Sequence, residues 1–137
     1  MADSTILELI YELKKKCIQG DEDFFNSLDI SQAEYNMFLC LKDCKHFNSY
    51  SVAEKMQLSL SRVSRIVDKM VTKEYLTRTT NKSDRRAIDI KMTPLGKEIM
   101  TKIIEYRFNR ETNLCDKIAT KDVDVIKTSL NKLIEAV

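Results

Sequence analysis

The sequence contains few of the residues that interrupt helices or bind metal ions. Its 137 residues include 2 glycines, 1 proline, 1 histidine and no tryptophan. Scarce glycine and proline indicate a mainly α-helical chain with few turns. The 4 cysteines (Cys17, Cys40, Cys44 and Cys115) form no Cys-x-x-Cys pair, and His46 is the only histidine. The chain therefore lacks a zinc-binding pattern, and we expect no metal or other cofactor and buried, reduced thiols.

Features of enzymes, membrane proteins and secreted proteins are also missing. There is no glycine-rich phosphate loop and no nucleophile motif, so the sequence does not predict an enzyme. A thiol-based activity is left open and would require an unusually acidic Cys17 or Cys115. No apolar run is long enough to cross a bilayer, and Asp3 and Glu8 interrupt the apolar N-terminus, unlike a signal peptide. We expect a cytoplasmic protein that does not bind membranes.

Apolar spacing predicts six helices and a β-hairpin in one compact domain over residues 1–137. The helices are expected to begin at residues 4, 31, 50, 60, 94 and 120, and the hairpin to cover residues 76–92. Gly20 is expected to end the first helix, and an acidic connection to follow over residues 21–30. Ser31 and Glu34 form a capping box, and Thr120 is the expected cap of the last helix.

The helix expected over residues 60–74 has two chemically different faces. Val63, Ile66, Val67 and Met70 recur at helical spacing and form one apolar stripe. The remaining positions and the N-cap carry hydroxyls and cations, namely Ser59, Ser61, Arg62, Ser64, Arg65 and Lys69. A helix with a buried apolar back and a cationic front suits insertion into the major groove of DNA.

Positive charge is concentrated in this helix and the hairpin. Between residues 62 and 91 there are nine Lys or Arg residues and four Asp or Glu residues, a local net charge of +5. The whole chain carries only +2, so the rest of the chain carries −3. Such clustering, with Lys82, Arg85 and Arg86 near the hairpin tip, is typical of a nucleic-acid-binding surface.

Two stretches resemble the MarR family of winged helix-turn-helix regulators. They are SLSRVSRIVDKM over residues 59–70 and DRRAIDIKMTPLG over residues 84–96. The resemblance implies a mainly α fold with a winged helix-turn-helix lobe over residues 31–93 and dimerisation helices over residues 1–20 and 94–137. It also implies a homodimer that binds palindromic double-stranded DNA, usually as a repressor, and is released by a small-molecule effector or an oxidant.

Carried over position by position, the resemblance assigns the contacts with DNA. Arg86 would be the wing arginine at the minor groove, whose negative potential attracts a guanidinium, and Asp84 would pair with it. The complete expected DNA-binding set is Ser59, Ser61, Arg62, Ser64, Arg65, Lys69, Lys82, Asp84, Arg85 and Arg86. One position departs from the family: Glu74 stands where a glycine usually follows the recognition helix, so this helix is expected to end without a left-handed glycine.

The sequence says less about the signal that such a regulator would sense. Aromatic residues that could line a ligand pocket are Tyr11, Phe38, Tyr106 and Phe108, although aromatics on amphipathic helices more often belong to the core. Cys17 is the candidate redox thiol, because the neighbouring Lys14, Lys15 and Lys16 are expected to lower its pKa. The alternative to a DNA-binding regulator is a winged-helix protein-interaction module, which the clustered charge disfavours.

Overall fold

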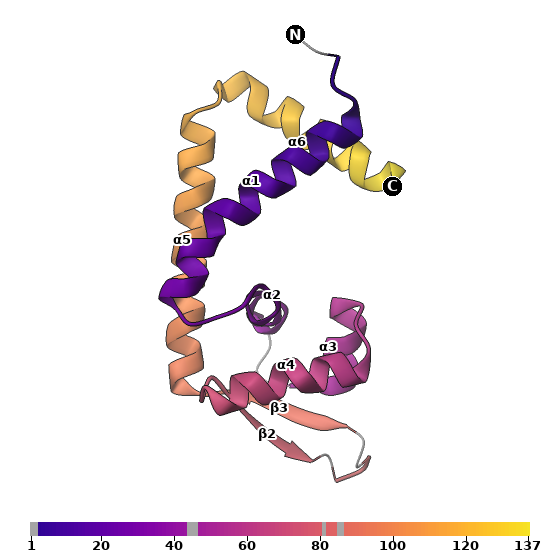
Figure 1. Cartoon of the computed structure of the whole chain (residues 1–137), viewed down its shortest axis with the longest axis vertical. Helices are drawn as coiled ribbons and strands as arrows, with labels where there is room; N and C mark the ends of the chain where they lie inside the picture. Colours follow the sequence, from indigo (N-terminus) through magenta and orange to yellow (C-terminus); the bar gives the residue numbers. More distant parts are fainter. Residues whose placement is uncertain (1–2, 44–46, 81, 85–86) are drawn as a thin grey trace. The chain divides into compact units, whose positions relative to one another are not determined.

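The computed structural model describes residues 3–43, 47–80, 82–84 and 87–137, and all structural statements below refer to these residues (Figure 1). They form two compact units, residues 1–100 and residues 101–137, which we describe separately. The elements of the chain, in order, are α1 (Ile6–Ser27), α2 (Gln32–Leu41), β1 (Phe47–Asn48), α3 (Ser49–Met56), α4 (Leu60–Thr72), β2 (Leu76–Thr80), β3 (Ile88–Met92), α5 (Pro94–Asp116) and α6 (Thr120–Ala136). Within the described ranges, no helix combines the length and apolar character needed to cross a membrane.

Helix α1 is longer than the sequence indicated. It begins at a Thr5–Glu8 capping box and continues through Gly20 to Ser27, so the expected stop at Gly20 and the irregular acidic connection over residues 21–27 are wrong. One glycine costs a helix only about 1 kcal/mol, which neighbouring contacts can offset. Phe25 supplies such contacts, because it is buried and its ring centroid lies 4.7 Å from that of Tyr35.

Helix α2 forms the centre of the first unit. The predicted capping box is confirmed: Ser31 Oγ accepts from the Glu34 amide at 3.1 Å, and a Glu34 carboxylate oxygen accepts from the Ser31 amide at 3.2 Å. Met37, Phe38 and Leu41 are almost completely buried, as a helix covered on several sides requires.

Helices α3 and α4 follow as a helix-turn-helix pair, and the predicted two-faced character of α4 is confirmed. Gln57 ends α3 in the left-handed conformation, and Ser59 caps α4 by accepting a hydrogen bond from the Arg62 amide. All four residues of the predicted apolar stripe of α4 are buried, so the opposite face is the one left for solvent or a ligand.

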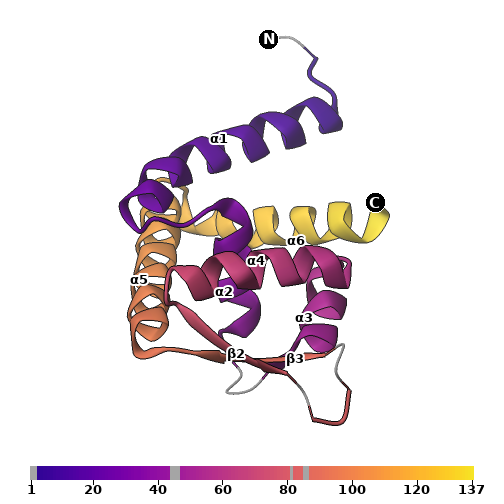
Figure 2. The same cartoon turned by 60° about the horizontal axis from the view of Figure 1, so that its bottom comes forward.

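The three strands form an antiparallel sheet in the order β1-β3-β2. Leu76 pairs with Met92 and Thr80 with Ile88, so β2 and β3 make the predicted hairpin, which is seen side-on in Figure 2. Leu76 and Ile90 are buried, whereas the remaining four residues of β2 are exposed. Leu76 and Ile90 therefore anchor the hairpin to the core, and β2 is exposed from Thr77 to Thr80.

The start of α5 packs directly against the backbone that follows α4. A Cβ atom at Gly96 would lie 2.1 Å from the Tyr75 carbonyl oxygen, so only glycine fits without movement. The Gly96 amide donates to Thr93 Oγ1 at 2.9 Å, so Thr93 caps the start of α5.

The second unit comprises the rest of α5 and helix α6. Helix α6 includes Thr120 as its first residue and has Ala119 at the N-cap position, without a side-chain cap, so the prediction that Thr120 caps it is wrong. No residue of α6 is buried, although its apolar residues recur at helical spacing. Several stay exposed, namely Val125, Ile126, Leu130 and Ile134.

The cysteines correct a further expectation. Cys17 is exposed, and Cys40 and Cys115 are half-buried, so none of the three described cysteines is buried as expected. Cys44 and His46 lie outside the described residues.

Candidate nucleic-acid interface

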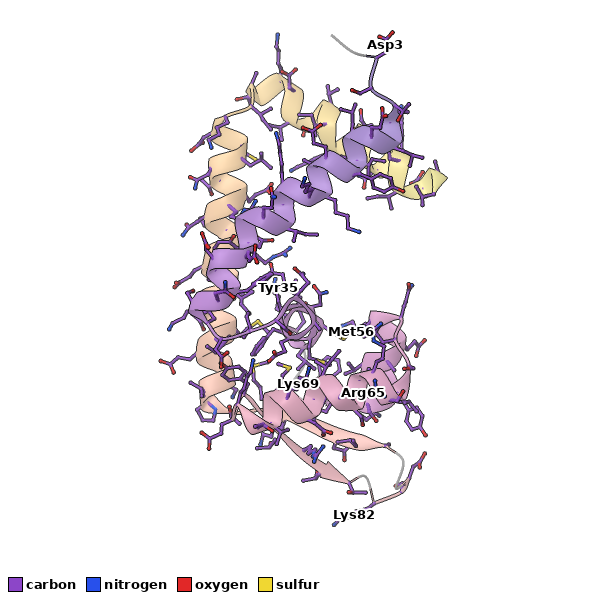
Figure 3. All side chains as sticks on the ribbon, viewed as in Figure 1. Asp3, Tyr35, Met56, Arg65, Lys69 and Lys82 are labelled. Atoms are coloured by element: carbon purple, nitrogen blue, oxygen red, sulfur yellow. The ribbon has the colours of Figure 1, made fainter. Side chains whose placement is uncertain are left out.

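The exposed face of α4 presents the polar residues that the sequence singled out. Ser61, Arg62, Arg65 and Lys69 are exposed and Ser64 is half-buried. Figure 3 labels Arg65 and Lys69 along this helix. Burial of the apolar stripe fixes the rotation of α4 about its own axis. The polar side chains on the opposite face are therefore held in solvent. The candidate surface is thus set by packing on the other side of the helix.

The N-terminus of α4 adds hydrogen-bonding groups to this surface. Ser59 Oγ lies 3.2 Å from Ser61 Oγ and accepts from the Arg62 amide at 3.2 Å. A helix N-terminus carries a partial positive charge and favours anions such as phosphate. Hydroxyls, backbone amides and Arg62 therefore gather at one end of the helix.

Positive charge on this face is not neutralised by the residues that the structure describes. Among the described residues, Arg62, Arg65 and Lys69 form no ion pair. The one carboxylate on α4, that of Asp68, pairs with Arg78 of β2. The three cations remain available to an anionic ligand.

The Asp68–Arg78 pair was not anticipated from the sequence. It joins α4 to the first strand of the hairpin, and both side chains are about half exposed. An exposed pair of this kind contributes little to stability, under about 1 kcal/mol. The pair matters for position and not for stability, because it links α4 to strand β2 of the hairpin. In the sequence, the only indication of this pair was one acidic residue, Asp68, on a helix rich in cations.

The hairpin tip is described in part. Lys82 is exposed near the tip, where Figure 3 labels it, and Asp84 is half-buried with its carbonyl accepting from the Ala87 amide at 3.0 Å. Arg85 and Arg86 lie outside the described residues, so the Asp84–Arg86 pair stays a prediction.

The backbone after α4 adopts the usual conformation of a helix end although Glu74 replaces the glycine typical of the family. This residue has φ 65°, the left-handed conformation that a glycine usually supplies at a helix end. Thr93 Oγ1 lies 2.6 Å from the Glu74 carbonyl and 3.0 Å from that of Tyr75, close enough to donate to either. The chain therefore turns from α4 into the hairpin although position 74 carries a side chain.

The candidate ligand residues are distributed over both units. In the first unit, Phe38 is fully buried in the core, 5.8 Å from the Tyr75 ring centroid, and Tyr11 is 64% exposed. In the second, Tyr106 accepts a hydrogen bond from Arg110 at 3.1 Å and Phe108 is 70% exposed. The redox candidate Cys17 lies on an exposed part of α1. The pockets described in the first unit are lined by other residues.

Comparisons with known proteins agree on one family. A model of the MarR family matches residues 30–88. The HTH-type transcriptional regulator SarZ of Staphylococcus aureus strain MRSA252 is 23% identical over 127 residues, covering 90% of this chain and 85% of SarZ. Streptococcus pneumoniae FabT in complex with DNA gives a TM-score of 0.85 at 17% identity, covering 95% of this chain and 93% of FabT. The S. aureus MepR–DNA complex gives 0.81 at 16% identity, covering 98% and 99%. These two structures share the fold.

Proposed function

Because this chain belongs to the MarR family of winged helix-turn-helix transcriptional regulators, we propose that it binds a palindromic operator as a homodimer and represses transcription. The exposed face of α4 gives this proposal its strongest support. On this face Arg62, Arg65 and Lys69 have no ion-pair partner among the described residues. In this proposal α4 enters the major groove, and the hairpin reaches the adjacent minor groove.

Each part of the surface has a separate role in the proposal. Arg65 and Ser64 read base edges, because arginine and hydroxyl side chains match the hydrogen-bonding groups of the major groove. Ser59, Ser61 and Arg62 hold phosphates at the N-terminus of α4. Toward the hairpin, the proposed contacts are Lys69, Lys82, Asp84, Arg85 and Arg86, with Arg86 in the minor groove.

Exposed apolar residues support the homodimer. Within α1, Ile6, Leu9 and Leu13 are each more than half exposed, and within α6 Ile134 is 71% exposed. Apolar side chains repeated along helices are stabilised when a partner removes them from water. A two-fold dimer would present two copies of α4 to two half-sites, which makes a palindromic site the matching target.

Regulation by a small molecule or an oxidant is the second part of the proposal. Cys17 is exposed, as an oxidant-sensing thiol must be. Cys115 is the less suitable thiol, because desolvation and the neighbouring Glu111 raise its pKa and disfavour the reactive thiolate. Oxidation with hydrogen peroxide should lower operator affinity in the wild type and leave it unchanged in Cys17→Ser.

The test of DNA binding uses duplex DNA from upstream of the gene's own coding region and a scrambled duplex. We expect selective binding that weakens by at least about a hundredfold between 50 and 200 mM salt, because several phosphates are contacted. Arg65→Ala should cost about 1–3 kcal/mol of binding free energy, whereas Arg107→Ala, on α5, should cost nothing measurable. Absence of binding to either duplex by folded, reduced protein would favour the protein-interaction module.

Repression requires a separate measurement. A reporter gene under a promoter that carries the bound duplex should be expressed less when the wild type is present, and Arg65→Ala should restore expression. Higher expression in the presence of the wild type would identify an activator and overturn this part of the proposal.

A further inference from the structure

The three residues after α4, Lys73 to Tyr75, are bound by the connection between α1 and α2. The Lys73 ammonium donates to the Asp29 carbonyl at 2.8 Å and to Glu34 Oε1 at 2.9 Å. The Tyr75 hydroxyl donates to the Leu28 carbonyl at 2.9 Å. Leu28 caps the end of α1 and Asp29 follows it, so the bonds to their two carbonyls join the end of α1 to the end of α4. The bond to Glu34 joins the end of α4 to α2.

Glu74 and Tyr75 are also bound by residues at the start of α5. The Thr93 amide donates to the Tyr75 carbonyl at 3.1 Å, and its hydroxyl lies within hydrogen-bonding distance of the Glu74 and Tyr75 carbonyls. Gly96 approaches the Tyr75 carbonyl so closely that a Cβ atom would collide with it. The end of α1, the end of α4 and the start of α5 therefore meet at one place, which we call the α4 clasp (Glu34, Lys73, Tyr75 and Thr93).

The buried carboxylate of Glu34 depends on the other residues of the clasp. The Glu34 side chain is only 3% exposed, and its Oε2 atom has no hydrogen-bond partner in the described part of the chain. A buried carboxylate without a nearby cation is strongly disfavoured, so Glu34 requires Lys73 beside it. Although partial burial by itself lowers the pKa of Lys73, the hydrogen bond to Glu34 and the charge of that carboxylate raise it overall.

We propose that Glu34, Lys73 and Tyr75 are positioning residues that hold the recognition helix at one place relative to the end of α1 and the start of α5. The inference rests on the proposed function, in which two copies of α4 enter two half-sites. Because half-sites lie at a fixed spacing, the place of α4 in each subunit decides which spacing is bound. The clasp would thus set spacing selectivity without touching DNA.

The conservative variants Tyr75→Phe and Glu34→Gln test the inference, with Tyr50→Phe as the control. The first removes one hydroxyl from a buried ring and the second removes one charge, and both keep the side-chain shape. Tyr50 lies on α3 and is 39% exposed, so its variant makes the same chemical change away from the clasp. All four proteins would be studied at full length.

Amide hydrogen exchange of the free proteins reports the coupling without DNA. Loss of one net hydrogen bond changes a local equilibrium by roughly three- to tenfold. In both clasp variants we expect exchange to accelerate by that factor at residues 28–30 and 93–97 together, and not in α6. The inference would be overturned if exchange accelerated at only one of these two segments, accelerated equally throughout the chain, or did not change. It would also be overturned if Tyr50→Phe gave the same pattern as the clasp variants.

DNA binding then reports selectivity. Duplexes would be selected from a random library with the wild type and rebuilt with one base pair added or removed between the half-sites. The wild type and Tyr50→Phe should prefer the selected spacing, and that preference should fall at least about threefold in both clasp variants. An unchanged preference would contradict the inference. If the wild type selects no sequence, the proposed function fails, and the exchange data alone decide whether the clasp couples the three helices.

Discussion

The segment from α2 to β3, which we call the lobe (residues 31–93), and helix α6 differ in where their apolar side chains lie. In the lobe, Met37, Phe38 and Val63 are completely buried. In α6 no residue is buried, and Leu130 and Ile134 are 41% and 71% exposed. The difference teaches that the lobe obtains its stability from contacts within its own unit, whereas α6 presents an apolar surface suited to a partner. The predictions below test that division.

The largest effect is expected from emptying the core of the lobe. Phe38→Ala should lower the free energy of unfolding by about 3–5 kcal/mol, because it leaves a cavity in a completely buried position. Phe108→Ala, the same change at a residue that is 70% exposed, should change it by less than about 0.5 kcal/mol. Chemical denaturation at one protein concentration measures both. Equal losses would contradict the view that the buried core of the lobe supplies its stability.

The proposed dimer should be sensitive to charge on α6. Leu130→Asp places a carboxylate on the apolar face, and we expect dimer dissociation to increase on the order of a hundredfold, about 2.7 kcal/mol. Thr128→Asp, which lies on the opposite face of the same helix, is the control and should leave the dimer intact. Sedimentation velocity over a range of concentrations measures the change. A Leu130→Asp protein that remains as dimeric as the control would remove α6 from the interface.

Substituting alanine for each of the two glycines should change the free energy of unfolding in opposite directions. Gly96→Ala should cost about 1–2 kcal/mol of unfolding free energy, since strain against the Tyr75 carbonyl exceeds the gain in helix propensity. Gly20→Ala, in the interior of α1, should instead stabilise the protein by about 0.5–1 kcal/mol. Thermal denaturation distinguishes them. A stabilising Gly96→Ala would refute the close approach at the start of α5.

Much of the lobe was predictable because its signals are local. The apolar stripe of α4, the Ser59 cap and the Ser31–Glu34 capping box are each encoded within a few neighbouring residues. The pairs Asp68–Arg78 and Glu34–Lys73 join residues from different elements, and no local pattern shows which charges will meet. The continuation of α1 past Gly20 depended likewise on burial of Phe25. The predicted roles of Arg85 and Arg86 concern residues outside those described.

A smaller effect is expected at alkaline pH, where the clasp of the lobe should weaken. Burial raises the pKa of Tyr75 above its usual value of 10.0, and the pKa of Lys73 is raised by Glu34. Raised folded-state pKa values mean that this stability is fully present below pH 10 and is lost as pH rises through the folded values. Unfolding free energy should therefore fall as the pH rises above 10, and fall less in the double variant Lys73→Met/Tyr75→Phe. An equally steep fall in that variant would assign the effect to other groups.

The most direct test of the division between lobe and terminal helices is a hydroxyl-radical footprint on DNA selected by the protein. We predict two equal protected patches centred about one helical turn apart, 10–10.5 base pairs, or a multiple of that distance. In Leu130→Asp the paired protection should be lost at the protein concentration that protects both patches in the wild type. A single patch in the wild type, or paired protection that survives in a monomeric Leu130→Asp protein, would contradict the account.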